Sequence, residues 1–259
     1  MAQPQLAQST SPISHAPKEL QRARALVLHY GWNAMTYQIL NPGIDRWYTA
    51  NQDSVVGYVP AAGYHVVAGA PVCAPEQLAT VAQAFAASTH LKRRQVCYFG
   101  AQERLVQILA EAGPVATLLL GAQPTWNPQH WRNLFDQKAS LRAQLSRARN
   151  KGVKVTLWPN ERAHEHPALK QVLHRWLETR GLPPMHFLVE WNLLAHLLDR
   201  RVFVAERGRH VVGFLVASPI PLRNGWLIEQ IIREDGAPNG TNELLLDTAF
   251  ADLAARGAE

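Results

Sequence analysis

Cysteine is scarce in this sequence, with only Cys73 and Cys97 among 259 residues. Neither lies in a CxxC motif or near histidines, so the ligand spacing of a zinc site is missing. Two cysteines allow at most one disulfide bond, which excludes a small disulfide-stabilised secreted fold and fits a reducing compartment. The eleven histidines form no HExxH motif, and we predict no metal site.

Long apolar runs are also missing. One long uncharged stretch, Gly113–Trp131, is interrupted by Pro114, Pro124 and Pro128. The sequence contains no run of about 18 apolar residues that could span a bilayer. Residues 1–17 have neither the basic start nor the apolar centre of a secretory signal, so we expect a disordered leader. We therefore expect a cytoplasmic protein, with peripheral contact at the inner membrane face as an open alternative.

Two enzyme classes lose support because their motifs are absent. There is no GxSxG elbow, which argues against a serine hydrolase, and no P-loop, which argues against a nucleotidase. Charged residues make up only 18% of the chain and hydrophobic residues 47%. This composition excludes a mostly disordered chain and provides for sizeable buried cores.

Positive charge is concentrated in the middle of the chain. The segment Arg132–Arg209 has 15 basic and 7 acidic residues, a net charge of +8, whereas the residues after it carry a net charge of -4. A basic middle indicates a polyanionic partner such as nucleic acid, an anionic lipid headgroup or a phosphorylated cofactor. The alternative is a set of ordinary solvated helix faces.

Hydrophobic periodicity and turn residues predict an α+β fold. We expect helices over Lys18–Leu40, Pro75–Ser88, Gln102–Ala112, Asp136–Asn150, His166–Arg180, Val189–Leu198 and Asn239–Arg256. We expect strands over Arg46–Ala50, Ser54–Val59, Tyr64–Ala68, Gln95–Phe99, Val115–Leu120, Val153–Trp158, Val202–Glu206, His210–Ala217 and Trp226–Ile232.

The order of these elements suggests two α+β units with a boundary near Thr125–Trp131. The first unit would cover residues 18–125, and the second, with a linker helix, residues 126–259. The last predicted helix ends shortly before the final residue, whereas a helix packed on a sheet normally continues into another strand. We therefore expect the second unit to be incomplete at its C-terminal end.

The predicted helix over Asp136–Asn150 has one apolar and one basic side. Leu134, Leu141, Leu145 and Ala148 recur at a spacing that should face a core. On the basic side, a row of Arg and Lys in a cleft would hold phosphates. The members of this row are Lys138, Arg142 and Arg149, with Arg147 pointing elsewhere. The simpler alternative is a solvated basic face.

The segment Trp226–Glu243 predicts a strand, a turn of small residues and a helix. Backbone N–H groups at the start of such a helix favour an anion, and Arg233 at the end of the strand would add a second positive group. The turn Ala237–Gly240 lacks the Gly-rich pattern that usually holds coenzyme A. A simpler role is a helix cap, made by Asn239 or Thr241.

Glu229 interrupts the apolar part of this strand. If the strand alternates regularly, Glu229 shares one face with Leu227 and Ile231, where a carboxylate is unusual. A buried carboxylate with a raised pKa could serve as a general base. The equally weighted alternative is a structural Glu paired with an Arg such as Arg233.

Several of these segments together resemble one known family, the catalytic domain of phosphatidylglycerol lysyltransferases. The resemblance covers roughly Arg24 to the C-terminus and is carried by the order of the segments HYGWNAMTYQILNPGIDRWY, KASLRAQLSRARNKGVKV, GLPPMHF, GFLVASPIP and IREDGAPNGTNELLLDTAF. It implies two tandem acetyltransferase-like (GNAT) subdomains joined by a helix. It also implies transfer of an aminoacyl group from aminoacyl-tRNA to an acceptor hydroxyl, often that of an anionic lipid.

The resemblance also implies roles for individual residues. Those that match the basic helix and the strand–turn–helix of the family, and so would bind substrate or carry the reaction, are Lys138, Arg142, Arg147, Glu229, Arg233, Asn239 and Glu243. Glu229 would act as a base or an orienting group, and Arg233 would bind an anion or the oxyanion. The membrane-embedded region common in the family is not in this sequence, which leaves the acceptor open.

Three functions follow as hypotheses. The first is an aminoacyltransferase without metal or redox cofactor, because the donor ester is already activated. The second is an N-acyltransferase that uses acyl-coenzyme A. The third is an inactive module that binds RNA or an anionic membrane. These hypotheses differ in which donor group, if any, is transferred.

Overall fold

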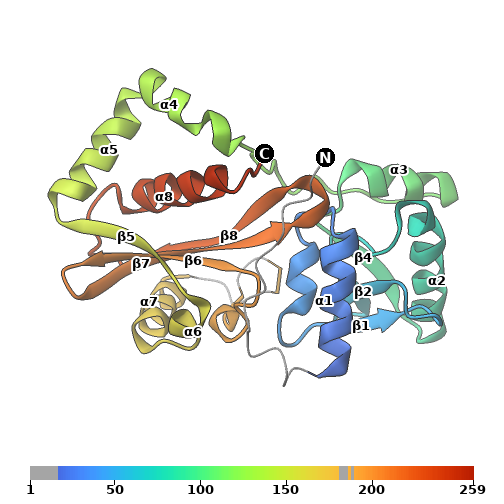
Figure 1. The fold of residues 1–259 in the computed structure, drawn as a ribbon. Coiled ribbons are helices and arrows are strands. Elements are labelled where there is room, and N and C mark those ends of the chain that lie inside the picture. Colours follow the sequence, from blue (N-terminus) through green and yellow to red (C-terminus); the bar gives the residue numbers. More distant parts are fainter. Residues whose placement is uncertain (1–16, 181–185, 188–189) are drawn as a thin grey trace.

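Two four-stranded sheets form the framework of the chain, each with helices on both of its faces (Figure 1). The computed structural model describes residues 17–180, 186–187 and 190–259. Apart from Pro17, the predicted leader lies outside these residues. The predicted α+β class is confirmed by this arrangement.

The first sheet has the strand order β1 (Asp45–Tyr48), β2 (Val55–Ala61), β3 (Tyr64–Ala68) and β4 (Gln95–Phe99). Strands β1 to β3 are antiparallel, whereas β3 and β4 are parallel. The parallel pair requires a crossover, which helix α2 (Leu78–Leu91) supplies after the short 3₁₀ helix η3 (Pro75–Gln77).

Both faces of the first sheet are covered by apolar side chains. Helix α1 (Lys18–Tyr30) and the 3₁₀ helix η2 (Thr36–Leu40) pack on one face, where Val27 and Ile39 are fully buried. Helices α2 and α3 (Glu103–Ala112) pack on the other face. Figure 1 shows α2 and α3 on the side of this half that is away from the second sheet.

The second sheet is antiparallel throughout. Its strands lie in sequence order: β5 (Val153–Trp158), β6 (Arg201–Arg207), β7 (His210–Ile220) and β8 (Gly225–Arg233). The short 3₁₀ helix η6 (Pro221–Arg223) joins the last two strands.

Helices cover the second sheet from two sides. One side has α6 (Asn160–Ala163) and α7 (Pro167–Glu178), and the other has α5 (Ala139–Asn150) and α8 (Thr241–Ala255) (Figure 1). Leu145 and Ala148 of α5 are buried against α8 and the sheet, as their spacing predicts.

The prediction of one helix over Asp136–Asn150 is wrong at its start. Lys138 is not helical, with φ -119° and ψ 85°, so the helix begins only after it. A separate helix, α4 (Trp131–Gln137), precedes it and follows the 3₁₀ helix η4 (Pro128–His130). The break gives α4 and α5 different directions, and both pack on α8.

Three further predictions need correction. The helix over Lys18–Leu40 ends at Tyr30, because Gly31 takes an extended conformation. Val115–Leu120 forms no strand: it lacks a neighbouring strand, and Leu118 to Leu120 are exposed to solvent. Of the helix predicted over Val189–Leu198, Val189 lies outside the described residues, and the rest contains only the 3₁₀ helix η5 (Leu193–Ala195).

The two sheets are linked by residues 113–127, and the boundary predicted near Thr125–Trp131 falls at the end of this link. In the part of the chain that the structure describes, every helix is too short or too polar to cross a bilayer.

Candidate functional site

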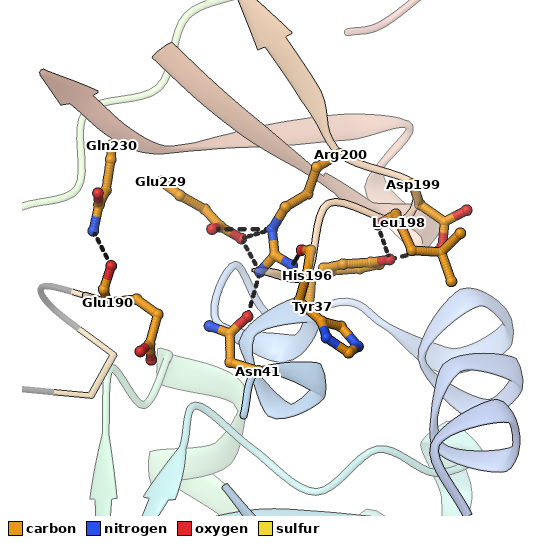
Figure 2. Close-up of polar contacts among 9 residues, drawn as sticks. All are labelled: Tyr37, Asn41, Glu190, His196, Leu198, Asp199, Arg200, Glu229 and Gln230. Atoms are coloured by element: carbon orange, nitrogen blue, oxygen red, sulfur yellow. Dashed lines mark hydrogen bonds and ion pairs between the residues drawn. The ribbon is translucent and has the colours of Figure 1, made fainter. Parts of the chain in front are cut away.

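A buried ion pair between Arg200 and Glu229 lies where the two halves of the chain meet (Figure 2). Nη2 of Arg200 donates to Oε1 of Glu229 at 3.0 Å, and Nε donates to both carboxylate oxygens at 3.2 Å. The side chain of Arg200 is 0% exposed and that of Glu229 is 3% exposed. Charges buried this deeply need close partners, because desolvation is costly.

The remaining partners of Arg200 come from both halves. Its Nη1 donates to the backbone carbonyl of His196, and its Nη2 donates to Oδ1 of Asn41 at 2.7 Å. The guanidinium also lies 5.0 Å from the ring centroid of Tyr37, within the range of a cation–π contact. Asn41 and Tyr37 belong to the first half, so the first half completes the environment of a charge pair in the second.

Asp199 makes a second connection across the same junction. It accepts from Nε and Nη2 of Arg24 at 2.6 Å each, and from the hydroxyl of Tyr37 at 2.7 Å. Burial, together with the charge of Asp199, raises the pKa of Tyr37 well above its ordinary value, so Tyr37 stays a neutral hydrogen-bond donor. The pKa of His196 is lowered by burial and by the neighbouring Arg200.

Three buried side-chain oxygens on elements of this junction have no hydrogen-bond partner among the described residues. They are Oε1 of Gln38 on η2, Oγ of Ser218 on β7 and Oε1 of Gln230 on β8. Helix η2 packs against β7, and Nε2 of Gln230 donates to the carbonyl of Glu190 at 3.4 Å (Figure 2). Oxygens of this kind accept hydrogen bonds from ordered water or from a bound molecule.

Glu229 reaches the junction because β8 is irregular at that residue. Gln230 pairs with Val216 and Ile228 pairs with Ala217, so Glu229 is the extra residue of a β-bulge. Leu227 and Ile231 therefore lie on opposite faces of the sheet, and the prediction that Glu229 shares one face with both is wrong. The bulge turns a single carboxylate toward Arg200.

The structure decides which partner Glu229 has. The sequence suggested Arg233, but the carboxylate is paired with Arg200, and the described residues include no ion pair of Arg233. Both carboxylate oxygens of Glu229 are engaged, an arrangement that suits an orienting or charge-balancing role. Whether Glu229 acts as base or orienting group stays a prediction.

Arg233 lies four residues further along β8, at the edge of a surface hollow of about 470 Å³. The wall of this hollow is formed by Arg175, Trp176, Glu178, Thr179, Arg233, Glu234, Asp235 and Gly236. Nη1 of Arg233 is 3.4 Å from the carbonyl of Ala237, a weak contact. Glu234 is held by Arg175 at 3.0 Å and by His210 at 2.8 Å, which leaves the guanidinium of Arg233 without a carboxylate partner in the described structure.

The turn before α8 is packed against α5. Gly240 has φ +92°, and a Cβ there would lie 2.0 Å from the carbonyl oxygen of Gln144. The prediction that Asn239 or Thr241 caps the helix is wrong: Gly240 is the N-cap residue, and Thr241 donates instead to the carbonyl of Pro238. Glu243 lies in the first turn of α8, where the helix dipole favours a negative charge.

The basic residues of α5, and Lys138 directly before it, are exposed and lie apart from the buried pair. Lys138, Arg142 and Arg147 face solvent, and Arg147 donates to Gln144 at 3.2 Å. Arg149 is paired with Asp247 of α8 at 2.8 Å. Figure 1 shows α5 at the end of the second half that is away from the first half. The predicted site residues are thus distributed over the junction, the hollow at Arg233, the start of α8 with Asn239 and Glu243, and the surface of α5.

Sequence reasoning missed Arg200, Asn41 and Tyr37. A weak signal for Arg200 existed, because Asp199 and Arg200 directly precede the apolar strand β6, which begins with Arg201. The described residues contain no group of three side chains that could hold a metal ion.

Comparisons with known proteins identify relatives of this chain. The profile of the family "Phosphatidylglycerol lysyltransferase, C-terminal" matches residues 24–259. None of the functionally curated proteins matches the chain significantly.

Solved structures of low sequence identity share the fold. One is described as the C-terminal domain of a lysylphosphatidylglycerol synthetase from Agrobacterium fabrum. It matches with a TM-score of 0.81 and 17% sequence identity, and the match covers 93% of this chain and 76% of that chain. L-PGS from Bacillus licheniformis has a TM-score of 0.77 and 16% identity, over 92% of this chain and 73% of that one. A conserved protein of unknown function from Bacteroides thetaiotaomicron has a TM-score of 0.67 and 12% identity, over 92% of this chain and 86% of that one. These structures show that the mixed α+β fold of this chain is shared, and the acetyltransferase-like subdomains stay a prediction.

Proposed function

The chain belongs to the family of the C-terminal domain of phosphatidylglycerol lysyltransferases, and from this membership we propose that it moves an aminoacyl group from aminoacyl-tRNA to a hydroxyl of an anionic lipid. The observation that carries the proposal is the family match across residues 24–259. The exposed basic residues of α5 support it, because both the donor and the acceptor carry phosphates.

The proposed reaction exchanges one ester for another. The acceptor hydroxyl attacks the carbonyl carbon of the aminoacyl ester, the bond from that carbon to the ribose oxygen breaks, and the ribose oxygen takes up a proton. No oxidation state changes, so the protein has three tasks: to position both substrates, to assist the proton transfer and to stabilise the oxyanion.

We propose roles for individual residues from the family resemblance, and the positions of these residues support them. Glu229, held on both oxygens by Arg200, would orient the acceptor hydroxyl or receive its proton. Arg233 at the hollow would stabilise the oxyanion or a donor phosphate. The residues proposed to bind the phosphates of donor or acceptor and to shape the start of α8 are Lys138, Arg142, Arg147, Asn239 and Glu243.

The test offers the purified chain several labelled donors in parallel. One arm contains tRNA charged with a mixture of labelled amino acids and vesicles of phosphatidylglycerol and phosphatidylcholine, and a second arm contains labelled acetyl-coenzyme A with amines. Label that enters the anionic lipid and is released by mild alkali supports the proposal.

Two results would contradict this function. Label transferred from acetyl-coenzyme A to an amine, with none from tRNA, would identify an N-acyltransferase. Binding of RNA or vesicles without transfer in either arm would identify an inactive binding module. Omitting each lipid in turn then defines the acceptor.

A further inference from the structure

A cluster of exposed residues lies at the C-terminal end of α2, far from the site described above. Leu91, the last residue of α2, is 87% exposed. The next three residues, Lys92, Arg93 and Arg94, are all basic, and the first two are exposed to solvent. Tyr64, 41% exposed, lies at the start of β3. We refer to these five residues as the basic tip.

The backbone holds the basic tip in a defined shape. Arg93 has φ +56°, and its N–H donates to the carbonyl of His90 at 2.8 Å, which ends the helix in a tight turn. Gln95 then donates to the carbonyl of Gly63 at 3.1 Å, and Tyr64 is paired with Gln95 between β3 and β4. Tyr64 and the three basic residues are therefore brought together by the sheet.

The positive charge of the basic tip is not balanced locally. Among the described residues, Lys92, Arg93 and Arg94 make neither an ion pair nor a side-chain hydrogen bond. They account for three of the eight Lys and Arg residues that precede residue 126. Their field extends to His65, whose pKa is lowered by burial and then by Lys92 and Arg94.

An ordinary structural role explains only part of this arrangement. Cations at the end of a helix interact favourably with the helix dipole, which accounts for basic residues at this position. The helix dipole does not account for the almost fully exposed Leu91, which directly precedes these basic residues. An aliphatic side chain next to several cations, with a tyrosine beside it, is the pattern of residues that enter the interface of an anionic bilayer.

We propose that the basic tip docks the protein on the surface of an anionic phospholipid bilayer, with Leu91 inserted among the acyl chains and the three cations at the headgroups. This inference deepens the proposed function, on which it rests for its biological sense, because an enzyme with a lipid acceptor must meet the bilayer. The three cations and the ring of Tyr64 also suit RNA, but RNA would leave the exposed Leu91 without a role, so the bilayer accounts for more of the basic tip.

The test measures how the full chain partitions onto vesicles of phosphatidylglycerol and phosphatidylcholine by co-sedimentation. Each Lys or Arg near an anionic surface contributes about fivefold to binding, so Lys92→Gln, Arg93→Gln and Arg94→Gln together should weaken binding about a hundredfold. Leu91→Ser alone should weaken it about tenfold or more, because an inserted leucine is lost. Vesicles of phosphatidylcholine alone should bind the wild type weakly.

Matched controls are available in the same chain. Lys154→Gln, Arg207→Gln and Arg209→Gln also remove three exposed cations, from β5, the end of β6 and the β6–β7 turn of the second half. Leu119 is 87% exposed like Leu91, but residues 105–131 contain no Lys or Arg. The triple control should change binding by less than about fivefold, and Leu119→Ser should leave it unchanged.

Equal binding by the basic-tip variant and the triple control would overturn the inference. The inference would also be overturned if the basic-tip variant kept its binding to vesicles and lost its binding to tRNA, since the basic tip would then contact RNA. Vesicle binding requires no catalysis, so a chain that fails to transfer an aminoacyl group but still binds through the basic tip would disprove the proposed function alone.

Discussion

The ion pair of Arg200 and Glu229 is the residue-scale feature on which the site depends. Removing one partner of a buried pair leaves an uncompensated charge, which costs about 3–5 kcal/mol. We therefore expect Arg200→Ala to lower the free energy of unfolding by this amount, measured by urea denaturation. Replacing both residues, as in Arg200→Met with Glu229→Leu, should recover most of the stability because no unpaired charge remains.

The same variants separate a structural role from a positioning role. If the pair positions the acceptor, the double variant is stable yet transfers aminoacyl groups at a small fraction of the wild-type rate. A stable double variant with a normal rate would limit the pair to structure.

The buried His65 and the half-buried His196 make stability depend on pH. His65 is 5% exposed and accepts or donates one hydrogen bond to Thr89 at 3.2 Å. Burial, followed by Lys92 and Arg94, lowers its pKa in the folded state, and burial also lowers that of His196. Below a pH of about 6.5 these histidines bind protons in the unfolded chain but stay neutral in the folded chain until the pH is lower. Stability should thus be complete above this pH and fall as the pH decreases below it.

Melting temperatures between pH 8 and pH 5 measure this effect. His65→Gln should make the decrease on the acid side shallower. An equally steep decrease in His65→Gln and wild type would show that His65 does not contribute.

At the residue scale, the sequence revealed more about single unusual residues than about their partners. Glu229 could be identified because a carboxylate interrupts an apolar strand. Its partner could not, because Arg200 is 29 positions away and Asn41 lies in the other half. The β-bulge that turns Glu229 is a property of strand pairing, and alternation along one strand does not predict it.

At the scale of elements, the close approach of α8 to α5 depends on Gly240. A Cβ at this position would meet the Gln144 carbonyl oxygen at 2.0 Å, so α8 would have to move. We expect Gly240→Ala to lower the free energy of unfolding by about 3 kcal/mol or more. Gly152 also has a positive φ, +81°, but open space around it, so Gly152→Ala should cost only about 1–2 kcal/mol.

The difference between these two variants isolates the helix contact from backbone strain. Equal losses of stability in urea denaturation would mean that the contact between α5 and α8 adapts without cost.

Strands and helices with strong local patterns were predicted well, whereas those that depend on neighbours were not. The strand Gln95–Phe99 was predicted with its observed bounds. Val115–Leu120 has the composition of a strand but no strand beside it in the structure. The break at Lys138 follows from the packing of α4 and α5 on α8, which periodicity within one helix cannot show.

At the scale of the whole molecule, Asp199 connects the two halves through Arg24 and Tyr37. We expect Asp199→Ala to loosen the junction, because three hydrogen bonds across it are lost. Small-angle scattering should show a larger radius of gyration, and proteases should cut the link of residues 113–127 faster. Asp252→Ala removes ion pairs to Arg201 at 2.7 Å and to Arg256 at 3.1 Å, both within the second half. It should leave the scattering profile unchanged, and an identical change in both variants would contradict the connecting role of Asp199.

We propose that this chain carries out aminoacyl transfer and that Arg233 takes part in it. The most direct test measures the initial rate of transfer from charged tRNA to vesicle lipid, together with the melting temperature, for wild type, Arg233→Ala and Arg233→Lys. Loss of an oxyanion donor lowers turnover by about a hundredfold or more, and lysine should restore little because it lacks the planar fork of arginine. We predict this loss with an unchanged melting temperature. A normal rate in Arg233→Ala, or a lower melting temperature with normal turnover of the folded fraction, would contradict the account.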